Sequence, residues 1–252
     1  MIDFDIQDGV LTWYKGEAES VVIPREVTRI GVEAFRDSEL VSVELHEGIT
    51  RIHRRAFMNC FRLREVVIPD SVTRIDSDAF SGCAALESVR LPAGLDALRS
   101  GVFVGCTALK SIELPEQLKL IGPVAFCDCA ALESVSLPEG LEEIGERAFG
   151  ECARLRLSAL PAHLKRLWTW AFEDSPIPEL TVGGELVELR DFMVPFRTRV
   201  IYAPEHRLED YLRGLNTYND ETEYPYHILE YGEGDRWRID REGEAPCLRR
   251  IK

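Results

Sequence analysis

Residues 132–154 read LESVSLPEGLEEIGERAFGECAR, and this 23-residue stretch decides the fold because it recurs along the chain. An aromatic anchor repeats at a step of 22 and then five steps of 23 residues, at Phe35, Phe57, Phe80, Phe103, Phe126, Phe149 and Phe172. A proline stands eleven residues before each anchor, except in the second copy, where His46 takes its place. The consensus is L-x-x-V-x-L-P-x-x-V-x-x-I-x-x-x-A-F-x-x-C-x-x. Seven copies in phase exclude chance and indicate a repeat architecture.

Each copy combines two kinds of local pattern. Residues 87–91 alternate polar and apolar side chains, as a half-buried strand does, and Pro92 ends the strand because proline cannot donate to a ladder. The spacing over residues 141–149 predicts a tight bend and a short helical turn. One copy is too small to bury its own apolar face, so copies must stack. The sequence therefore predicts an α/β right-handed solenoid with one parallel strand per 23-residue repeat and short helical turns, capped at both ends.

The motifs L-x-x-V-x-L-P and A-F-x-x-C resemble the BspA-like, or Treponema-type, leucine-rich repeat family of bacteria, over about residues 1–215. The resemblance implies a leucine-rich repeat fold. It also implies protein binding, since the family includes bacterial surface proteins that bind host or neighbouring-cell proteins. This sequence departs from those members because it shows no secretory signal, anchor or threonine-rich stalk.

The two ends differ from the repeats. Asp8-Gly9 lies between apolar runs and is a hairpin signal. Val200 and Tyr202 fit a ninth strand, and residues 205–215 fit a short amphipathic helix. The predicted organisation is an N-terminal β-hairpin cap, a repeat region with seven clear and about two degenerate copies, and a C-terminal cap with a tail, at residues 1–20, 21–204 and 205–252.

Composition excludes several function classes. The chain carries 44 acidic and 30 basic residues, a net charge of −14, so a nucleic-acid backbone would be repelled. No apolar stretch is long enough to span a bilayer. The five histidines share no spacing with a serine or cysteine nucleophile, and the sequence has no H-E-x-x-H, phosphate-loop or G-x-S-x-G motif. We expect no catalytic residues, no cofactor and no metal.

Five of the seven cysteines stand three residues after a repeat phenylalanine, at Cys60, Cys83, Cys106, Cys129 and Cys152. Their spacing is the repeat period, whereas disulfide or metal sites follow other spacings. Cys127 and Cys129 form one C-x-C pair, but a zinc site needs a second pair. The sequence favours a ladder of small buried thiols over a disulfide set or a metal site. Unpaired thiols are typical of a reducing compartment.

Arginines occupy one repeat position in three successive copies, as Arg29, Arg51 and Arg74, and Arg54 and Arg55 lie nearby. Stacked like charges repel, so a feature of the structure must offset them. Neighbouring carboxylates are one candidate, and those closest in the repeat are Glu33, Asp76 and Asp78. The alternative is that these five arginines form a binding patch for an anionic partner.

Two tryptophans, Trp168 and Trp170, occupy positions that other copies mostly give to glycine or charged residues. They fall in the last complete repeat. We expect them either to pack against residues 186–215 under the C-terminal cap or to form a second binding patch.

These observations lead to a functional hypothesis. The sequence predicts a non-catalytic protein-binding scaffold, either a bacterial surface or host-interaction protein or, alternatively, an intracellular adaptor or assembly module that binds another bacterial protein. The start of the sequence has no basic region followed by an apolar run. We therefore expect a cytoplasmic protein if the chain is complete, and a cell-surface or secreted protein if a signal peptide has been removed. The sequence specifies neither the identity of the protein partner nor the oligomeric state.

Overall fold

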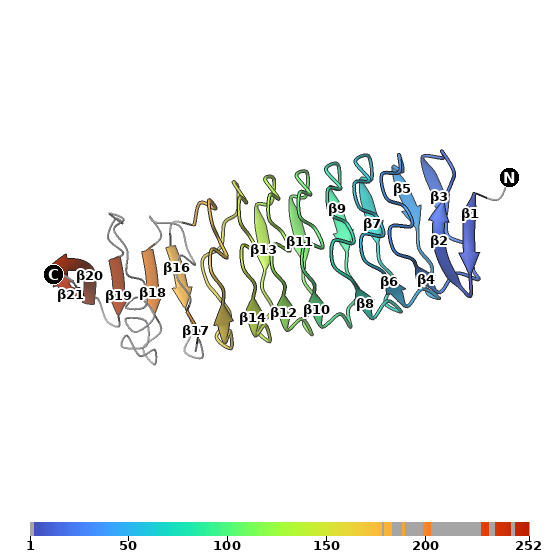
Figure 1. Ribbon diagram of the computed structural model, residues 1–252. Helices are drawn as coiled ribbons and strands as arrows, with labels where there is room; N and C mark the ends of the chain where they lie inside the picture. Colours follow the sequence, from blue (N-terminus) through green and yellow to red (C-terminus); the bar gives the residue numbers. More distant parts are fainter. Residues whose placement is uncertain are drawn as a thin grey trace.

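The computed structural model describes residues 3–177 and several strands beyond them. Those strands are β16 (Glu179–Val182), β17 (Glu188–Leu189), β18 (Arg199–Tyr202), β19 (Ile228–Tyr231), β20 (Asp235–Glu242) and β21 (Ala245–Ile251). The repeats form a stack of coils, with β1 near one end and β21 near the other (Figure 1). In this part of the chain no helix is long and apolar enough to cross a membrane.

Each of the first six coils contributes two short parallel strands, and the seventh contributes β15 alone, so the prediction of one strand per repeat was wrong. The V-x-L segment forms the long strands β3 (Ser20–Val22), β5 (Ser42–Glu44), β7 (Glu65–Val67), β9 (Ser88–Arg90), β11 (Ser111–Glu113) and β13 (Ser134–Ser136). A second row holds the two-residue strands β4 (Arg29–Ile30), β6 (Arg51–Ile52), β8 (Arg74–Ile75), β10 (Ala97–Leu98), β12 (Leu120–Ile121), β14 (Glu143–Ile144) and β15 (Arg166–Leu167). Figure 1 shows the two rows on opposite edges of the coils. Two residues are too few to show a period of two, which is why the sequence pattern missed the second row.

The long strands lie in the register that the repeat predicts. Val66 pairs with Val89, and Ile112 pairs with Val135, in parallel ladders. All four side chains are buried, which confirms the predicted parallel solenoid with a repeat of about 23 residues. The right-handed sense of the coil stays a prediction.

The third side of each coil is a turn and not the predicted helical turn. Two residues per coil have a positive φ, for example Asp78 at 60° and Gly82 at 73° in the third copy, and a right-handed helix excludes such residues. Alternate backbone N–H groups bond to the next coil, as Phe57 N does to Ala79 O at 2.8 Å and Phe80 N to Val102 O at 2.9 Å, while the N–H groups between them close turns within their own coil. Among residues 3–177 the chain forms no helix.

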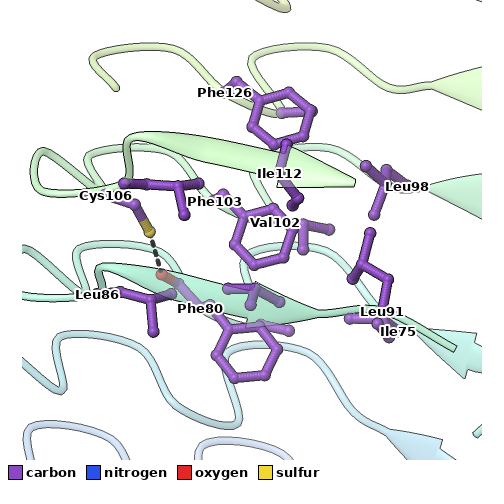
Figure 2. Close-up of a cluster of buried hydrophobic side chains, with 14 of the residues drawn as sticks. Ile75, Phe80, Leu86, Leu91, Leu98, Val102, Phe103, Cys106, Ile112 and Phe126 are labelled. Atoms are coloured by element: carbon purple, nitrogen blue, oxygen red, sulfur yellow. Dashed lines mark hydrogen bonds between the residues drawn. The ribbon is translucent and has the colours of Figure 1, made fainter. Parts of the chain in front are cut away.

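The core contains a continuous stack of phenylalanine rings. Consecutive anchors from Phe35 to Phe172 lie with ring centroids 4.9–5.7 Å apart and interplanar angles of 2–15°. Figure 2 shows Phe80, Phe103 and Phe126 one above another. Every anchor is at most 1% exposed. Burying each ring stabilises the fold by about 1.5–3 kcal/mol, and each aromatic contact adds about 0.5–1.5 kcal/mol.

The repeat cysteines form the buried ladder that the sequence favoured. Each is fully buried, and its thiol donates to the carbonyl oxygen of the phenylalanine one coil back: Cys106 Sγ lies 3.3 Å from Phe80 O (Figure 2). The other four make the same bond at 3.1–3.2 Å. In the last copy Ser175 Oγ takes over the role, 2.6 Å from Phe149 O. The thiol is thus a small polar group that satisfies a buried carbonyl.

A hairpin covers the first coil. Strands β1 (Phe4–Gln7) and β2 (Val10–Tyr14) are antiparallel, and Asp8 and Gly9 turn between them with φ of 49° and 72°. This is the turn that the Asp8-Gly9 pair predicts. Strand β2 then pairs with β4 in parallel, and the Tyr14 ring lies 5.2 Å from Phe35, so the aromatic stack continues into the hairpin.

At the other end the repeat geometry persists in the degenerate copies. β15 pairs with β17, and β16 pairs in parallel with β18, which is the predicted ninth strand around Val200. β18 pairs with β19 in parallel, and β19, β20 and β21 continue as an antiparallel meander. The predicted helix at residues 205–215 lies outside the described residues, and the three segment boundaries stay predictions.

The ladder predicts the reactivity of the thiols. Burial raises the pKa of Cys106 and of Cys152 to about 12, so at pH 8 only roughly one in ten thousand of these thiols is the reactive thiolate. We expect iodoacetamide to leave the six described cysteines unmodified in the native protein and to modify all seven after denaturation, as measured by intact mass. Rapid native labelling of five or more would contradict the ladder.

Candidate binding surface

Three arginines lie side by side at the start of the two-residue strands. Arg29 pairs in register with Arg51, and Arg51 with Arg74, in adjacent parallel strands. The isoleucine after each arginine is fully buried, so the arginine side chains lie on the outer face of this row. Adjacent strands are about 4.8 Å apart, and like charges at that distance repel.

Asp76 offsets this repulsion. Arg51 donates from Nε and Nη2 to Asp76 Oδ2 at 2.9 and 2.7 Å, and Arg74 donates from Nε to Oδ1 at 2.6 Å. His53 Nδ1 lies 3.6 Å from Oδ2, and Arg99 Nε lies 4.0 Å from Oδ1. One carboxylate from the third coil therefore joins cationic groups from three coils.

The environment keeps Asp76 ionised. The residue is only 7% exposed, and burial alone would raise the pKa of its carboxyl. The hydrogen bonds from Arg74 and Arg51 outweigh burial, so the pKa lies below its usual value. For His53, burial and the nearby Arg51 lower the pKa of the ring, which is therefore neutral at pH 7.

A second set of ion pairs lies beside the first. Arg55 bridges Glu33 at 3.4 Å and Asp78 at 3.5 Å, and Arg54 lies 3.7 Å from Asp78. Arg36 donates to Glu33 at 3.1 Å. Arg29, at the edge, donates from Nη2 to the carbonyl of Asp8 at 3.2 Å.

We name this group the arginine cluster. It comprises Arg29, Arg36, Arg51, Arg54, Arg55, Arg74 and Arg99 with the carboxylates Glu33, Asp37, Asp76 and Asp78. The structure brings together all five arginines singled out in the sequence, and the three carboxylates proposed to offset them are the ones they contact. Sequence reasoning missed Arg36, Arg99 and the role of His53. Repeat register was the available signal for two of them, because His53 and Arg99 occupy the position of Asp76 in the neighbouring copies.

In the seventh copy the two tryptophans occupy the positions that Asp76 and Asp78 hold in the third copy, about three coils beyond Arg99, or roughly 15 Å. Trp168 Nε1 donates to Glu143 Oε1 at 2.7 Å, and Arg166 donates from Nε to Oε2 of the same carboxylate at 2.9 Å. Trp168 is therefore anchored to the preceding coil. Trp170 is 39% exposed and has a φ of 56°. The predicted contact with residues 186–215 lies outside the described residues.

The 23-residue repeat matches that of a known protein family. A model of the BspA-type leucine-rich repeat region, six copies long, matches residues 6–129 and 50–179. The chain belongs to this family. The residues that match the BspA-type model include both rows of strands, the arginine cluster and the two tryptophans. No curated protein is detectably similar to this chain.

Solved structures of bacterial leucine-rich repeat proteins are similar to this BspA-type chain. The T. pallidum protein TpLRR is 29% identical over 69% of this chain and 77% of its own, with a TM-score of 0.56. A protein from Eubacterium ventriosum is 24% identical over 74% of this chain and 49% of its own, with a TM-score of 0.61. A leucine-rich cell surface protein from Faecalibacterium prausnitzii is 21% identical, over 81% of this chain and 64% of its own, with a TM-score of 0.54. The chain spans about half of the Eubacterium protein, and these last two likenesses show the fold alone.

The Asp76 geometry predicts a pH-dependent loss of stability in Asp76→Asn. The amide cannot balance the surrounding arginines, so we expect the free energy of unfolding to fall by about 1–2 kcal/mol at pH 7. Because the pKa of Asp76 is lowered, its contribution is present at neutral pH and is lost as the pH falls through that lowered pKa. Urea unfolding at pH 7 and pH 3 measures the difference, with the exposed Asp96→Asn as control. Equal effects of the two variants at pH 7 would contradict the role of Asp76.

We expect Trp168 and Trp170 to contribute differently to the stability of the fold. Trp168→Phe loses the bond to Glu143, and we expect it to cost about 1 kcal/mol. Trp170→Asn places a residue that tolerates positive φ at an exposed position, so its melting temperature should stay that of the wild type. The double change to alanine should lower the melting temperature by several degrees. Calorimetry of the three variants measures this, and a double variant that melts like the wild type would contradict the structural role of Trp168.

Proposed function

We propose that this BspA-type chain is a non-catalytic protein-binding scaffold that binds its partner through the outer face of the two-residue strands and of the turns that follow them. The observation that carries the proposal is the arginine cluster. Its seven arginines face four carboxylates, a surplus of three positive charges on a chain of net charge −14. A cluster of one sign on a molecule of the other sign is typical of a recognition surface.

The solenoid suits this role for a physical reason. Backbone bonds join each coil to its neighbours, so residues from several coils keep fixed positions on one extended surface. Trp170, exposed in the turn of the seventh copy, supplies an aromatic side chain of the kind that anchors protein interfaces. The proposed contact residues are Arg29, Arg51, Arg54, Arg55, Arg74, Trp168 and Trp170.

Two settings for the scaffold are supported by different observations. The family and the cell-surface description of the Faecalibacterium protein favour a bacterial surface or host-interaction role. The buried free thiols favour an intracellular adaptor that binds another bacterial protein, because unpaired cysteines are typical of reducing compartments. Labelling of intact source cells with an impermeant reagent separates the two: modification of this chain supports the surface role, and protection of it supports the adaptor role.

The binding role is tested by capture with matched variants. We expect the immobilised chain to retain a specific protein from source-bacterium lysate or from host matrix extract. We expect Arg51→Ser/Arg74→Ser to lose at least about ten-fold in the amount retained. The control Arg90→Ser/Arg154→Ser removes the same charge from exposed positions elsewhere. Equal capture by both double variants would show that binding does not use the cluster, and an absence of any specific protein would contradict the scaffold role.

A further inference from the structure

The arginine cluster is chemically uniform. Residues 51–100 hold eight arginines and no lysine, and all seven cations of the cluster are arginines. The guanidinium group is planar and matches a carboxylate with two parallel N–H···O bonds, whereas an ammonium group acts as a point charge. The composition therefore favours recognition of planar carboxylates over general attraction of anions.

The two central arginines of the cluster, Arg51 and Arg74, are held in a fixed orientation by Asp76. Asp76 takes one edge of each guanidinium, through Nε and Nη2 of Arg51 and through Nε of Arg74. Among the described residues, no hydrogen bond uses Nη1 of Arg51 or either Nη atom of Arg74. Both side chains keep solvent contact, with 35% and 46% of their area exposed. Holding the donors in place before binding reduces the entropy lost on binding.

The surplus charge favours an additional anion. Asp76 is one carboxylate shared by Arg51 and Arg74, with Arg99 and His53 at longer range. A second carboxylate on the outer side of this pair would relieve the repulsion that remains between neighbouring strands. The effect is local, because at physiological salt the charges of the rest of the chain are screened beyond about 8 Å.

An apolar side chain lies beside the cluster. Val32 is 58% exposed, and its neighbour Glu33 donates from its backbone N to the carbonyl of Arg54 at 3.2 Å. Val32 thus borders Arg54, where the next coil begins its turn. A free phosphate or sulfate could use the arginines but would leave this aliphatic surface uncovered.

We infer that the arginine cluster docks an acidic polypeptide segment of the partner, with its carboxylates on Arg51 and Arg74 and an apolar side chain against Val32. This inference rests on the proposed protein-binding function and specifies the chemistry of the partner. The segment carries several aspartate or glutamate residues next to a leucine or a similar side chain.

A defined peptide tests the inference on the full chain. The probe is a fluorescent twelve-residue peptide of glutamate and aspartate with one central leucine, and its control has every acid replaced by the amide. Anisotropy titrations at 0.1 M salt should show binding of the acidic peptide only. Arg51→Gln/Arg74→Gln should weaken it by at least about ten-fold, and Arg90→Gln/Arg154→Gln by less than about two-fold. Val32→Ser should weaken the leucine peptide but leave unchanged the binding of a peptide with glycine at that position.

Several results would overturn the inference. They are equal binding of the acid and amide peptides, equal effects of the two double variants, and indifference to Val32→Ser. Tighter binding of heparin than of the peptide, lost in Arg51→Gln/Arg74→Gln, would instead identify a sulfated polysaccharide. If the central double variant melts early, the single variant Arg74→Gln replaces it, because Arg51 then still neutralises Asp76.

The two proposals fail in distinguishable ways. One outcome is that protein capture depends on Arg51 and Arg74 but the acidic peptide does not bind. This outcome would reject the acidic segment as the ligand and would leave the proposed scaffold function supported. Acidic-peptide binding with no captured protein from any source would support the chemistry of the cluster and reject the protein-binding role in the extracts tested.

Discussion

The hydrogen bonds that run from one coil to the next are the constraint on which this structure depends. On the turn side, Phe57 N donates to Ala79 O and Phe80 N to Val102 O, and both rows of strands exchange bonds in parallel ladders that are interrupted between β8 and β10 and between β9 and β11. The backbone bonds within one coil of about 23 residues are short turn bonds, such as Val72 N to Pro69 O, and its strands find partners only in the neighbouring coils. The positive φ angles of the turn residues aim these backbone groups along the stack.

The buried side chains follow from that constraint. Because successive coils keep the same backbone path, equivalent residues fall into columns, and a ring at one anchor position stacks on the ring of the next coil. The column of cysteines has the same origin. The thiol of Cys129 satisfies the carbonyl of Phe103, and in the last copy the hydroxyl of Ser175 satisfies that of Phe149. This repeat position therefore requires a small hydrogen-bond donor and does not require a reactive thiol. Burial raises the pKa of Cys106, which keeps its thiol protonated, in agreement with this role.

The outer surface inherits the same columns, and there the consequence is electrostatic. Identical residues in successive copies become neighbours about 4.8 Å apart, so a repeated arginine becomes a stripe of repelling charge. Asp76 resolves this by replacing the histidine or arginine that adjacent copies hold at its position. At the far end, Glu143 lies beside Arg166 in register, accepts its hydrogen bond and anchors Trp168 as well. Residues that depart from the repeat consensus are therefore the ones that distinguish the surface of this chain from a surface of identical BspA-type repeats.

The amino-acid sequence by itself determined the stacking, the half-buried V-x-L strands, the cysteine ladder and the Asp8-Gly9 hairpin, because each depends on a period or a turn signal within one short segment. It also identified the five arginines and the carboxylates beside them. Only the tertiary structure decided that each coil has a second strand and a turn in place of a helix, since two-residue strands show no period and their pairing belongs to the neighbouring coil. It likewise decided that Arg99 and His53 join Asp76, because that contact depends on the distance between coils and not on any spacing along the chain.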